Sequence, residues 1–370
     1  MALNHSSRLV SLDVLRGLTV VGMIVVNSMS AMKWGADAAI DPLLLHASWN
    51  GLSLADLVFP GFLMMVGVAI PLAFAKPAER SGPGAITARA GRLVLLGILL
   101  SNLAWLADFA SGDFRLFGVL QRIGLVYGAC ALLFLACGPR ARIGLIAAIL
   151  LLYWPLALLP ALDGLPTDIW MRGHNFVASV DRVLLGAGGH IYVKGPEGYD
   201  PEGLLGTLPA IAHGLIGVAI GEYLLRRPAR SARTLALAGA IMLAAGWTWG
   251  LVFPVIKDIW SSSFVLVTCG ITTLLLAGLH AWLDRPGPRA SATRLFTLFG
   301  TAFGINAIAA YVLHQLTAGV PVWQSMLLPF TLLRGALGDT AAAFAPVLLY
   351  VAMIWACMEY LRRRSWIVRI

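Results

Sequence analysis

Four side chains that could take part in chemistry stand close together in the stretch HASWNGLSLADLVFPGF: His46, Trp49, Asn50 and Asp56. A histidine can gain or lose a proton near neutral pH, and a neighbouring carboxylate can fix which ring nitrogen carries that proton. Ser53 and Asp56 also have the spacing of a helix capping box, in which the carboxylate only satisfies the start of a helix. The stretch therefore predicts either an acid–base site or a helix cap beside an apolar segment.

The elements that must position these residues are membrane helices. Of the 370 residues, 59% are hydrophobic and 12% are charged, whereas soluble domains average about 45–50% apolar and about 25% charged residues. Apolar runs of roughly 20 residues, the length that crosses a bilayer, recur along the chain. We therefore expect an all-α polytopic membrane protein with about ten transmembrane helices in one domain, residues 1–370. The spans are predicted at about residues 10–32, 54–75, 92–108, 116–137, 143–162, 204–225, 234–254, 262–283, 294–316 and 341–361.

The basic residues are distributed unevenly between the two sides of these spans. One set of connections, which includes both termini, holds 18 of the 27 Lys and Arg residues, and the other set holds 7. The positive-inside rule then places both termini in the cytoplasm, in an inner (plasma) membrane, and predicts outer loops at 33–53 and 163–203. The net charge of +9 follows from topology and anionic lipid, so no nucleic acid partner is needed. Residues 1–9 are polar and precede a spanning run, which predicts an anchor rather than a cleaved signal peptide.

Helix geometry brings several polar side chains to a similar depth near the outer face. Asn27 lies about 25 Å above the inner end of its helix, at 1.5 Å per residue. Gln121 and Arg122 lie about 9 Å from the outer end of theirs. A buried arginine is expensive without a partner, so Arg122 requires either Asp56 or a substrate anion. Because polar groups inside a membrane are costly and usually functional, this depth is the predicted reaction site.

Two further pairs of intramembrane residues have a spacing that suggests contact. Asn306 and His314 are eight residues apart and are expected on one face of a single span. Packing alone would also explain a lone histidine there. Asp13 and Arg16 are three residues apart near the inner end of the first span, where they can form a structural ion pair. Alternatively, Arg16 meets an anionic ligand from the cytoplasm.

The end of the long outer loop, YDPEGLLGT, contains two acidic residues. Asp200 followed by Pro201 is typical of a helix N-cap with proline at the first helical position. Glu202 is less easily explained as a cap and is a candidate for binding a cationic group. His174 and His190 lack metal-ligand spacing, so we predict no metal site. The four cysteines lie in predicted helices without a CxxC motif and indicate nothing about redox compartment.

Several long stretches resemble one known family, the lysosomal transmembrane heparan-α-glucosaminide N-acetyltransferases and their bacterial relatives. The resemblance covers residues 8 to about 362. The matching stretches, in the same order as in the family, are RLVSLDVLRGLTVVGMIVVN, HASWNGLSLADLVFPGF, GVLQRIGLVY, YDPEGLLGTLPAI, KDIWSSSFV and GINAIAAYVLH. The resemblance implies transfer of the acetyl group of cytosolic acetyl-CoA, across the membrane, to the amine of a glucosamine. It also implies a homodimer.

The resemblance also implies roles for individual residues. The family's catalytic histidine corresponds to His46, and an asparagine at the end of the first span corresponds to Asn27. The positions of Arg122, Asn306 and His314 are expected to line the core or the cofactor path. Together with the residues above, the predicted site is catalytic His46, Asn27 and Asp56; cofactor-binding Arg16, Gln121, Arg122, Asn306 and His314; and substrate-binding Trp49, Asn50, Asp200, Glu202 and Trp260.

This sequence departs from the lysosomal enzyme in having no large outer domain before the first span and a longer stretch between Asn27 and His46. We therefore expect a small amino sugar or cell-envelope fragment as the acceptor. A transporter of sugars or cell-wall fragments, with the same polar residues along its path, is the alternative. A purely structural protein is disfavoured, because it has no reason to bear the cost of so many polar groups at one depth.

Overall fold

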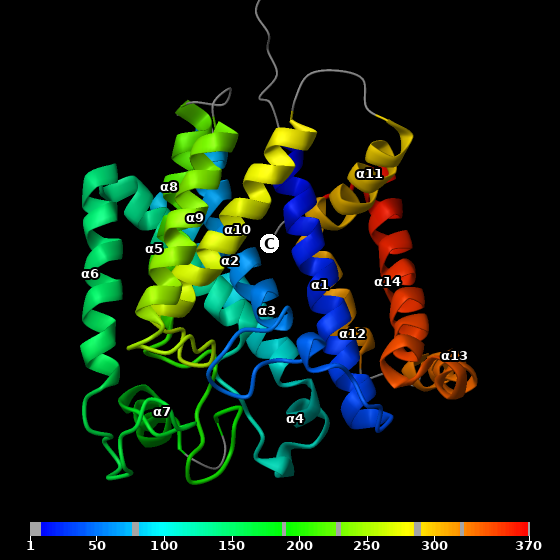
Figure 1. The fold of residues 1–370 in the computed structure, drawn as a ribbon, viewed down its shortest axis with the longest axis horizontal. Helices are drawn as coiled ribbons and strands as arrows, with labels where there is room; N and C mark the ends of the chain where they lie inside the picture. The colour runs from blue at the N-terminus through cyan, green and yellow to red at the C-terminus, as the bar shows by residue number, and fades with distance from the viewer. Residues whose placement is uncertain are drawn as a thin grey trace, which may run out of the picture.

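The computed structural model describes residues 9–75, 81–186, 190–226, 231–284, 290–318 and 322–368. Within these ranges the regular elements are all helices, accompanied by two isolated β-bridges. Figure 1 shows them as a bundle of long, roughly parallel helices. The elements are α1 (Val10–Gly35), η1 (Pro42–Leu44), η2 (Ala55–Leu57), α2 (Val58–Ala73), α3 (Pro83–Ser101), α4 (Leu103–Ala107), η4 (Phe109–Ser111), α5 (Val119–Ala136), α6 (Pro139–Ala157), α7 (Phe176–Leu185), α8 (Thr207–Arg226), α9 (Ser231–Trp249), α10 (Ser262–Leu283), α11 (Ser291–Ile305), α12 (Ala307–Thr317), α13 (Val322–Leu337) and α14 (Asp339–Arg363).

Eight helices of the described residues are long and apolar enough to cross a membrane, which confirms a polytopic helical membrane protein. They are α1, η2 with α2, α3, α5, α6, α8, α10 and α14, and the pair α11–α12 raises the number to nine if it counts as one span. A helix or helix pair occupies every predicted span, although α9, in the predicted span 234–254, is not among the helices that are long and apolar enough to cross. The third helix begins at Pro83 rather than near residue 92, because proline is well suited to the first turn of a helix.

The ninth predicted span is not one straight helix. The axes of α11 and α12 differ by 77° at a break at Asn306. Asn306 has a backbone φ of −114° and ψ of 39°, outside the helical region. The prediction that Asn306 and His314 share one continuous helical face was therefore wrong. The connection between the ninth and tenth predicted spans is also largely helical, since it contains α13.

Glycines allow the helices that carry the site to pack closely. On α1, a Cβ atom at Gly17 would collide with the backbone of Gly300 on α11. On α2, a Cβ atom at Gly67 would collide with the backbone of Gly214 on α8. Close backbone approach through small residues is the usual means of helix association in membranes. These contacts hold α1 against α11 and α2 against α8.

The long connections gather at one end of the bundle, which we call the loop end. It lies at the lower side of Figure 1, around α4 and α7, opposite the start of α1. An apolar cluster that includes Trp49, Tyr153, Tyr199 and Phe253 supports it. A β-bridge pairs Asn50 with Ile256 and thereby joins two segments about 200 residues apart in the sequence. Apolar packing and this bridge, rather than a sheet, hold the loops in place.

Candidate active site

The predicted acid–base residues meet directly at the loop end. Nδ1 of His46 lies 2.8 Å from Oδ1 of Asp56. The other carboxylate oxygen, Oδ2, accepts hydrogen bonds from the backbone N–H of Ala47 at 3.0 Å and of Ser53 at 3.1 Å, and from Oγ of Ser53 at 2.9 Å. Half of the predicted capping box therefore forms: Asp56 accepts from the backbone N–H of Ser53, but Oγ of Ser53 donates to the carboxylate instead of accepting from the backbone N–H of Asp56. The same carboxylate also holds the histidine. The two roles proposed for Asp56 are compatible.

The exposure of the two side chains suits acid–base chemistry. Asp56 is fully buried, whereas 43% of the His46 side chain is exposed. A carboxylate can only accept, so the proton between the two residues sits on Nδ1 of His46. Nε2 then keeps the lone pair with which it can accept a proton from another molecule.

Lys257 is a third member of this centre, and no role was predicted for it from the sequence. Its Nζ lies 3.3 Å from Oδ1 of Asp56 and 2.9 Å from Nδ1 of His46. The loop that carries it is attached to the His46 segment by the Asn50–Ile256 bridge and by a hydrogen bond from the backbone N–H of Gly51 to the carbonyl of Val255. In the sequence, only the position of Lys257 in the stretch KDIWSSSFV indicated that it could belong to the site. Asn50, predicted to bind substrate, thus contacts the Lys257 loop through its backbone.

A second histidine lies nearby with both ring nitrogens engaged. Nδ2 of Asn27 lies 3.2 Å from Nε2 of His314, and Nδ1 of His314 lies 3.1 Å from the hydroxyl of Tyr350. The amide nitrogen can only donate, so Nε2 accepts and Nδ1 carries the proton. His314 therefore fixes the orientation of Asn27.

An open hollow with about 1140 Å³ of empty space connects these groups, and we call it the loop-end hollow. Both histidines face it, together with Asn27 and Lys257. Its walls are Asn27, Ser28, Ser30, Ala31, His46, Arg115, Val119, Tyr192, Pro201, Glu202, Lys257, His314, Gln315, Ala318 and Tyr350. Basic, acidic and amide side chains thus share one space large enough for a small molecule.

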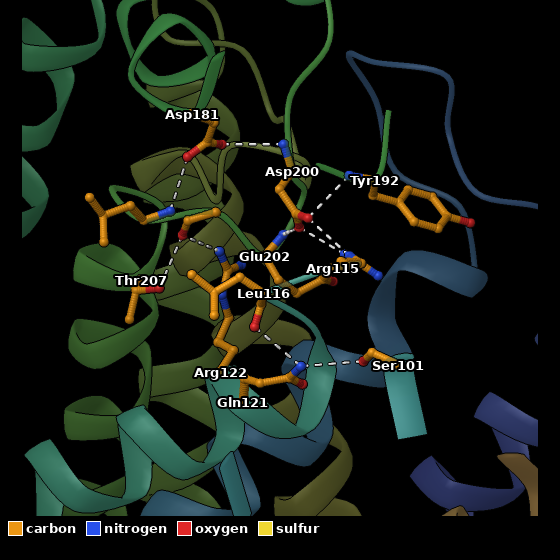
Figure 2. Close-up of polar contacts among 12 residues, drawn as sticks. Ser101, Arg115, Leu116, Gln121, Arg122, Asp181, Tyr192, Asp200, Glu202 and Thr207 are labelled. Carbon is orange, nitrogen blue, oxygen red and sulfur yellow. Dashed lines mark hydrogen bonds and ion pairs between the residues drawn. The ribbon is translucent and has the colours of Figure 1, made fainter. Parts of the chain in front are cut away.

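Arg115 organises the acidic residues on one wall of this hollow, as Figure 2 shows. Its Nε and Nη2 donate to the two carboxylate oxygens of Asp200 at 2.9 and 2.7 Å, and Nη2 also lies 2.5 Å from Oε2 of Glu202. Burial alone would raise the pKa of Glu202, but the charges of Arg115, Arg122 and Lys257 outweigh burial and lower it. Glu202 is therefore held as a carboxylate.

The predicted helix N-cap at Asp200 was wrong. Helix α8 begins only at Thr207, and Asp200 instead accepts a hydrogen bond from the backbone N–H of Glu202 at 2.9 Å within a turn. The carboxylate of Asp200 is bound by Arg115 in a bidentate pair and therefore does not cap helix α8. Burial outweighs the charge of Arg115 and raises the pKa of Asp200.

We expect Arg115→Met to destabilise the loop end. The substitution leaves two buried carboxylates without their shared cation, at a cost of about 3–5 kcal/mol in the free energy of unfolding. Thermal unfolding of purified protein in detergent measures the effect. Arg115→Lys, which retains the charge without the bidentate geometry, is the matched control and should lose less. An unchanged melting temperature in Arg115→Met would contradict the assignment.

Arg122 does not pair with Asp56, contrary to one predicted alternative. Its side chain is fully buried, Nη2 donates to the carbonyl of Gly203 at 3.1 Å, and the guanidinium lies 5.0 Å from the ring centre of Trp260. Asp56 is turned toward the His46 segment by the capping box, which explains the difference. Gln121 precedes Arg122 on α5, and its Nε2 lies 3.3 Å from Oγ of Ser101. Neither the Gln121 nor the Arg122 side chain borders the loop-end hollow.

The structure places both predicted substrate-binding tryptophans in the core. Trp49 is 6% exposed, and its Nε1 donates to the carbonyl of Ile169 at 3.0 Å. Trp260 is 1% exposed and packs edge-on against Phe59 and Phe264. Large aromatic surface favours burial where its N–H can be satisfied or its ring stacked.

A second hollow, with about 1430 Å³ of empty space, opens near the opposite end of the bundle. Arg16 and Arg89 lie on its walls, and Arg16 also pairs with Asp13 at 3.5 Å, as one alternative predicted. An apolar hollow of about 360 Å³ separates it from the loop-end hollow. The apolar hollow shares Val119 with the loop-end hollow and Phe62, Ala307 and Ile308 with the second one. The three hollows therefore adjoin one another from end to end.

The polar atoms of Asn306 hold the chain segment after α14 against the second hollow. Its Nδ2 donates to the carbonyl of Trp366 at 3.1 Å, and its Oδ1 accepts from the backbone N–H of Val368 at 3.0 Å. Ile367 and Val368 form part of the wall of this hollow. The side-chain amide of Asn306 thus bonds to backbone groups, and it shapes the second hollow by fixing the segment that forms part of its wall.

We expect Asn306→Leu to loosen this wall. Both hydrogen bonds are lost, each worth about 0.5–1.5 kcal/mol, so amide hydrogen exchange of residues 364–368 should accelerate. Any ligand of the second hollow should bind several-fold more weakly. Asn102→Leu is the matched control, since Asn102 likewise bonds only to backbone groups, at the loop end. Unaltered exchange in Asn306→Leu would contradict this role.

The fold and the site define a polytopic α-helical membrane protein with a carboxylate–imidazole centre facing an open hollow. Residues 8–246 match the family described as "Heparan-alpha-glucosaminide N-acetyltransferase, catalytic". Because the match covers more than half of the chain, the protein belongs to this family, as its motifs predicted.

Two curated relatives carry the name "Heparan-alpha-glucosaminide N-acetyltransferase". The chain is 29% identical to the protein from Homo sapiens over 368 residues and 28% identical to that from Mus musculus over 373 residues. The alignments cover 83% and 84% of this chain but 53% and 54% of the relatives. The chain thus spans about half the length of the curated relatives it matches.

Proposed function

We propose that this protein is a transmembrane N-acetyltransferase that moves the acetyl group of cytosolic acetyl-CoA to the amine of an amino sugar at the outer face of the membrane. The observation that carries the proposal is the His46–Asp56 pair in a hollow that shares part of its wall with a narrow apolar hollow inside the bundle. Family membership supports the reaction type. The positive-inside distribution of charge supports placing the loop end outside.

The second hollow suits the nucleotide end of the donor. Arg16 and Arg89 on its walls provide positive charge for phosphate groups. The narrow apolar hollow, lined by Phe59, Phe62 and Tyr311 among others, is the proposed course of the flexible pantetheine arm, and its side chains must move apart to admit that arm. A donor bound in this way would present its thioester to the loop-end hollow, where His46 lies.

The loop-end hollow suits a cationic, polar acceptor. The Glu202 carboxylate can pair with the ammonium group of an amino sugar. Tyr192 lies on the same wall with 65% of its surface exposed, and its ring is stacked against the guanidinium of Arg115, 4.5 Å away. An exposed, oriented aromatic ring provides a platform for the apolar face of a sugar ring. These two residues are the proposed acceptor contacts.

In the direct route, the acceptor ammonium first loses one proton to solvent. Nε2 of His46 then takes a second proton from the amine as its nitrogen attacks the thioester carbonyl carbon. The C–N bond forms, the C–S bond breaks, and the proton on Nε2 passes to the departing thiolate. The second N–H of Asn27, not used by His314, can donate to the developing oxyanion. In the relay route, Nε2 attacks the thioester first and coenzyme A leaves as the thiolate. The sugar amine then attacks the acetyl carbon, the bond to Nε2 breaks, and the amine protons pass to the thiolate and to solvent.

Thiol release from acetyl-CoA by the purified protein tests the proposal. Release that requires an amino sugar, with glucosamine first in the panel, would establish the direct transfer. Release without acceptor, with stoichiometric label on the protein, would establish the relay. No release from folded protein with any acceptor would contradict the enzyme. The adjoining hollows would then favour a transporter, tested by uptake of sugars into vesicles.

A further inference from the structure

Lys257 lies between the two residues of the acid–base pair. Its Nζ is 2.9 Å from Nδ1 of His46 and 3.3 Å from Oδ1 of Asp56, and only 15% of its side chain is exposed. We propose that Lys257 is a positioning residue of the acetyl transfer, whose ammonium balances the buried Asp56 carboxylate and so keeps the His46 ring uncharged and ready to accept a proton. This inference rests on the proposed function.

The argument begins with the charge of Asp56. A fully buried carboxylate beside an imidazole, with no cation at hand, favours the charged imidazolium. An imidazolium has no lone pair and cannot take a proton from an amine. A cation 2.9 Å from the ring opposes this protonation. In the described part of the chain, Lys257 is the lysine or arginine that forms an ion pair with Asp56.

The other charged groups around the ring have hydrogen-bond or ion-pair partners of their own. Glu202 and Arg115, which face the same hollow, form a pair at 2.5 Å, and Arg115 also holds Asp200. His314 faces the hollow with both ring nitrogens engaged. Asp258, next to Lys257 in the sequence, lies 2.5 Å from the hydroxyl of Tyr199. Lys257 is therefore the cation with the strongest effect on His46.

The geometry also determines which bonds can coexist. Asp56 can only accept and Lys257 can only donate, so Nδ1 of His46 can serve one of them at a time. While the Nδ1–H of His46 donates to Asp56, the Lys257 ammonium pairs with the same carboxylate. A hydrogen bond from Lys257 to Nδ1 forms only in the other tautomer, in which Nε2 carries the proton. When Nε2 gains the proton of the acceptor, the ring becomes positive beside an ammonium. That repulsion favours passing the proton on to the thiolate.

The pH dependence of kcat/KM in three variants tests the proposal. In Lys257→Met the acidic limb of the profile should move to higher pH by about one unit or more, because the ring is protonated more readily. Lys257→Arg keeps the charge and should keep the wild-type profile. Lys194→Met is the matched control, since Lys194 pairs with Asp113 in the loops and its side chain is 47% exposed. An unshifted profile in Lys257→Met would overturn the proposal.

A second measurement does not depend on the proposed reaction. Diethyl pyrocarbonate modifies uncharged imidazole, and peptide mass spectrometry reports the rate at His46 as a function of pH. The midpoint of this rate should also rise in Lys257→Met, and an unchanged midpoint would count against the proposal. If wild-type protein transfers no acetyl group, the proposed function fails while this comparison still decides the role of Lys257. Lys257→Gln replaces Lys257→Met if the latter does not fold.

Discussion

Replacing His46 with alanine is expected to lower kcat for acetyl transfer by about 10²–10⁴-fold, the usual contribution of a positioned acid–base group. The ring lies on a loop, 43% of the side chain is exposed, and its removal leaves the Asp56 capping bonds to Ala47 and Ser53 in place. The fold should therefore persist, and so should donor binding, which we propose to lie at the opposite end of the bundle. Thiol release from acetyl-CoA, together with acetyl-CoA binding by calorimetry, measures both.

The control for this variant is His190→Ala. His190 is exposed at the loop end, and its Nδ1 lies 2.7 Å from the carbonyl of Phe114, away from the loop-end hollow. Its replacement should leave the rate within twofold of wild type. If His46→Ala retained more than a tenth of the wild-type rate, His46 would not be the proton acceptor. If it lost acetyl-CoA binding, the placement of the donor would be wrong.

The second large effect is expected for Asp56→Asn, which should lower kcat by about 10²-fold or more through the wrong histidine tautomer. Oδ2 of Asp56 accepts three hydrogen bonds, from Ala47 and twice from Ser53. The oxygen of the asparagine amide will take this position, which turns its NH₂ toward Nδ1 of His46. Nδ1 must then accept, so the proton moves to Nε2 and the reacting lone pair is lost.

Ser53→Ala separates this effect from damage to the cap. It removes the hydroxyl donor but leaves the carboxylate, the backbone bonds and the His46 contact. We expect a loss of about 0.5–1.5 kcal/mol in stability with kcat within a few-fold of wild type. Equal losses of kcat in Asp56→Asn and Ser53→Ala would show that Asp56 acts only as a helix cap.

The sequence by itself determined the properties of this protein that depend on composition and on short spacings between residues. Hydropathy alone identified a polytopic helical membrane protein, because a bilayer requires long apolar helices whatever their neighbours are. The contact between Ser53 and the carboxylate of Asp56 formed as their spacing predicted, since three residues of chain restrict where the two groups can lie. The pairing of His46 with Asp56 belongs to the same class, ten residues apart on one connection.

The tertiary structure decided the contacts that join distant segments. Lys257 reaches His46 across 211 positions, and Arg115 reaches Asp200 across 85. Such contacts depend on how loops pack, which local spacing does not constrain. The same reason explains the errors. Nothing in the sequence distinguishes a tryptophan that lines a hollow from one that fills a core. Packing placed Trp49 and Trp260 in the core. The helix break at Asn306 arises where its amide holds the segment at residues 366–368, a partner 60 residues away that no helical periodicity reveals.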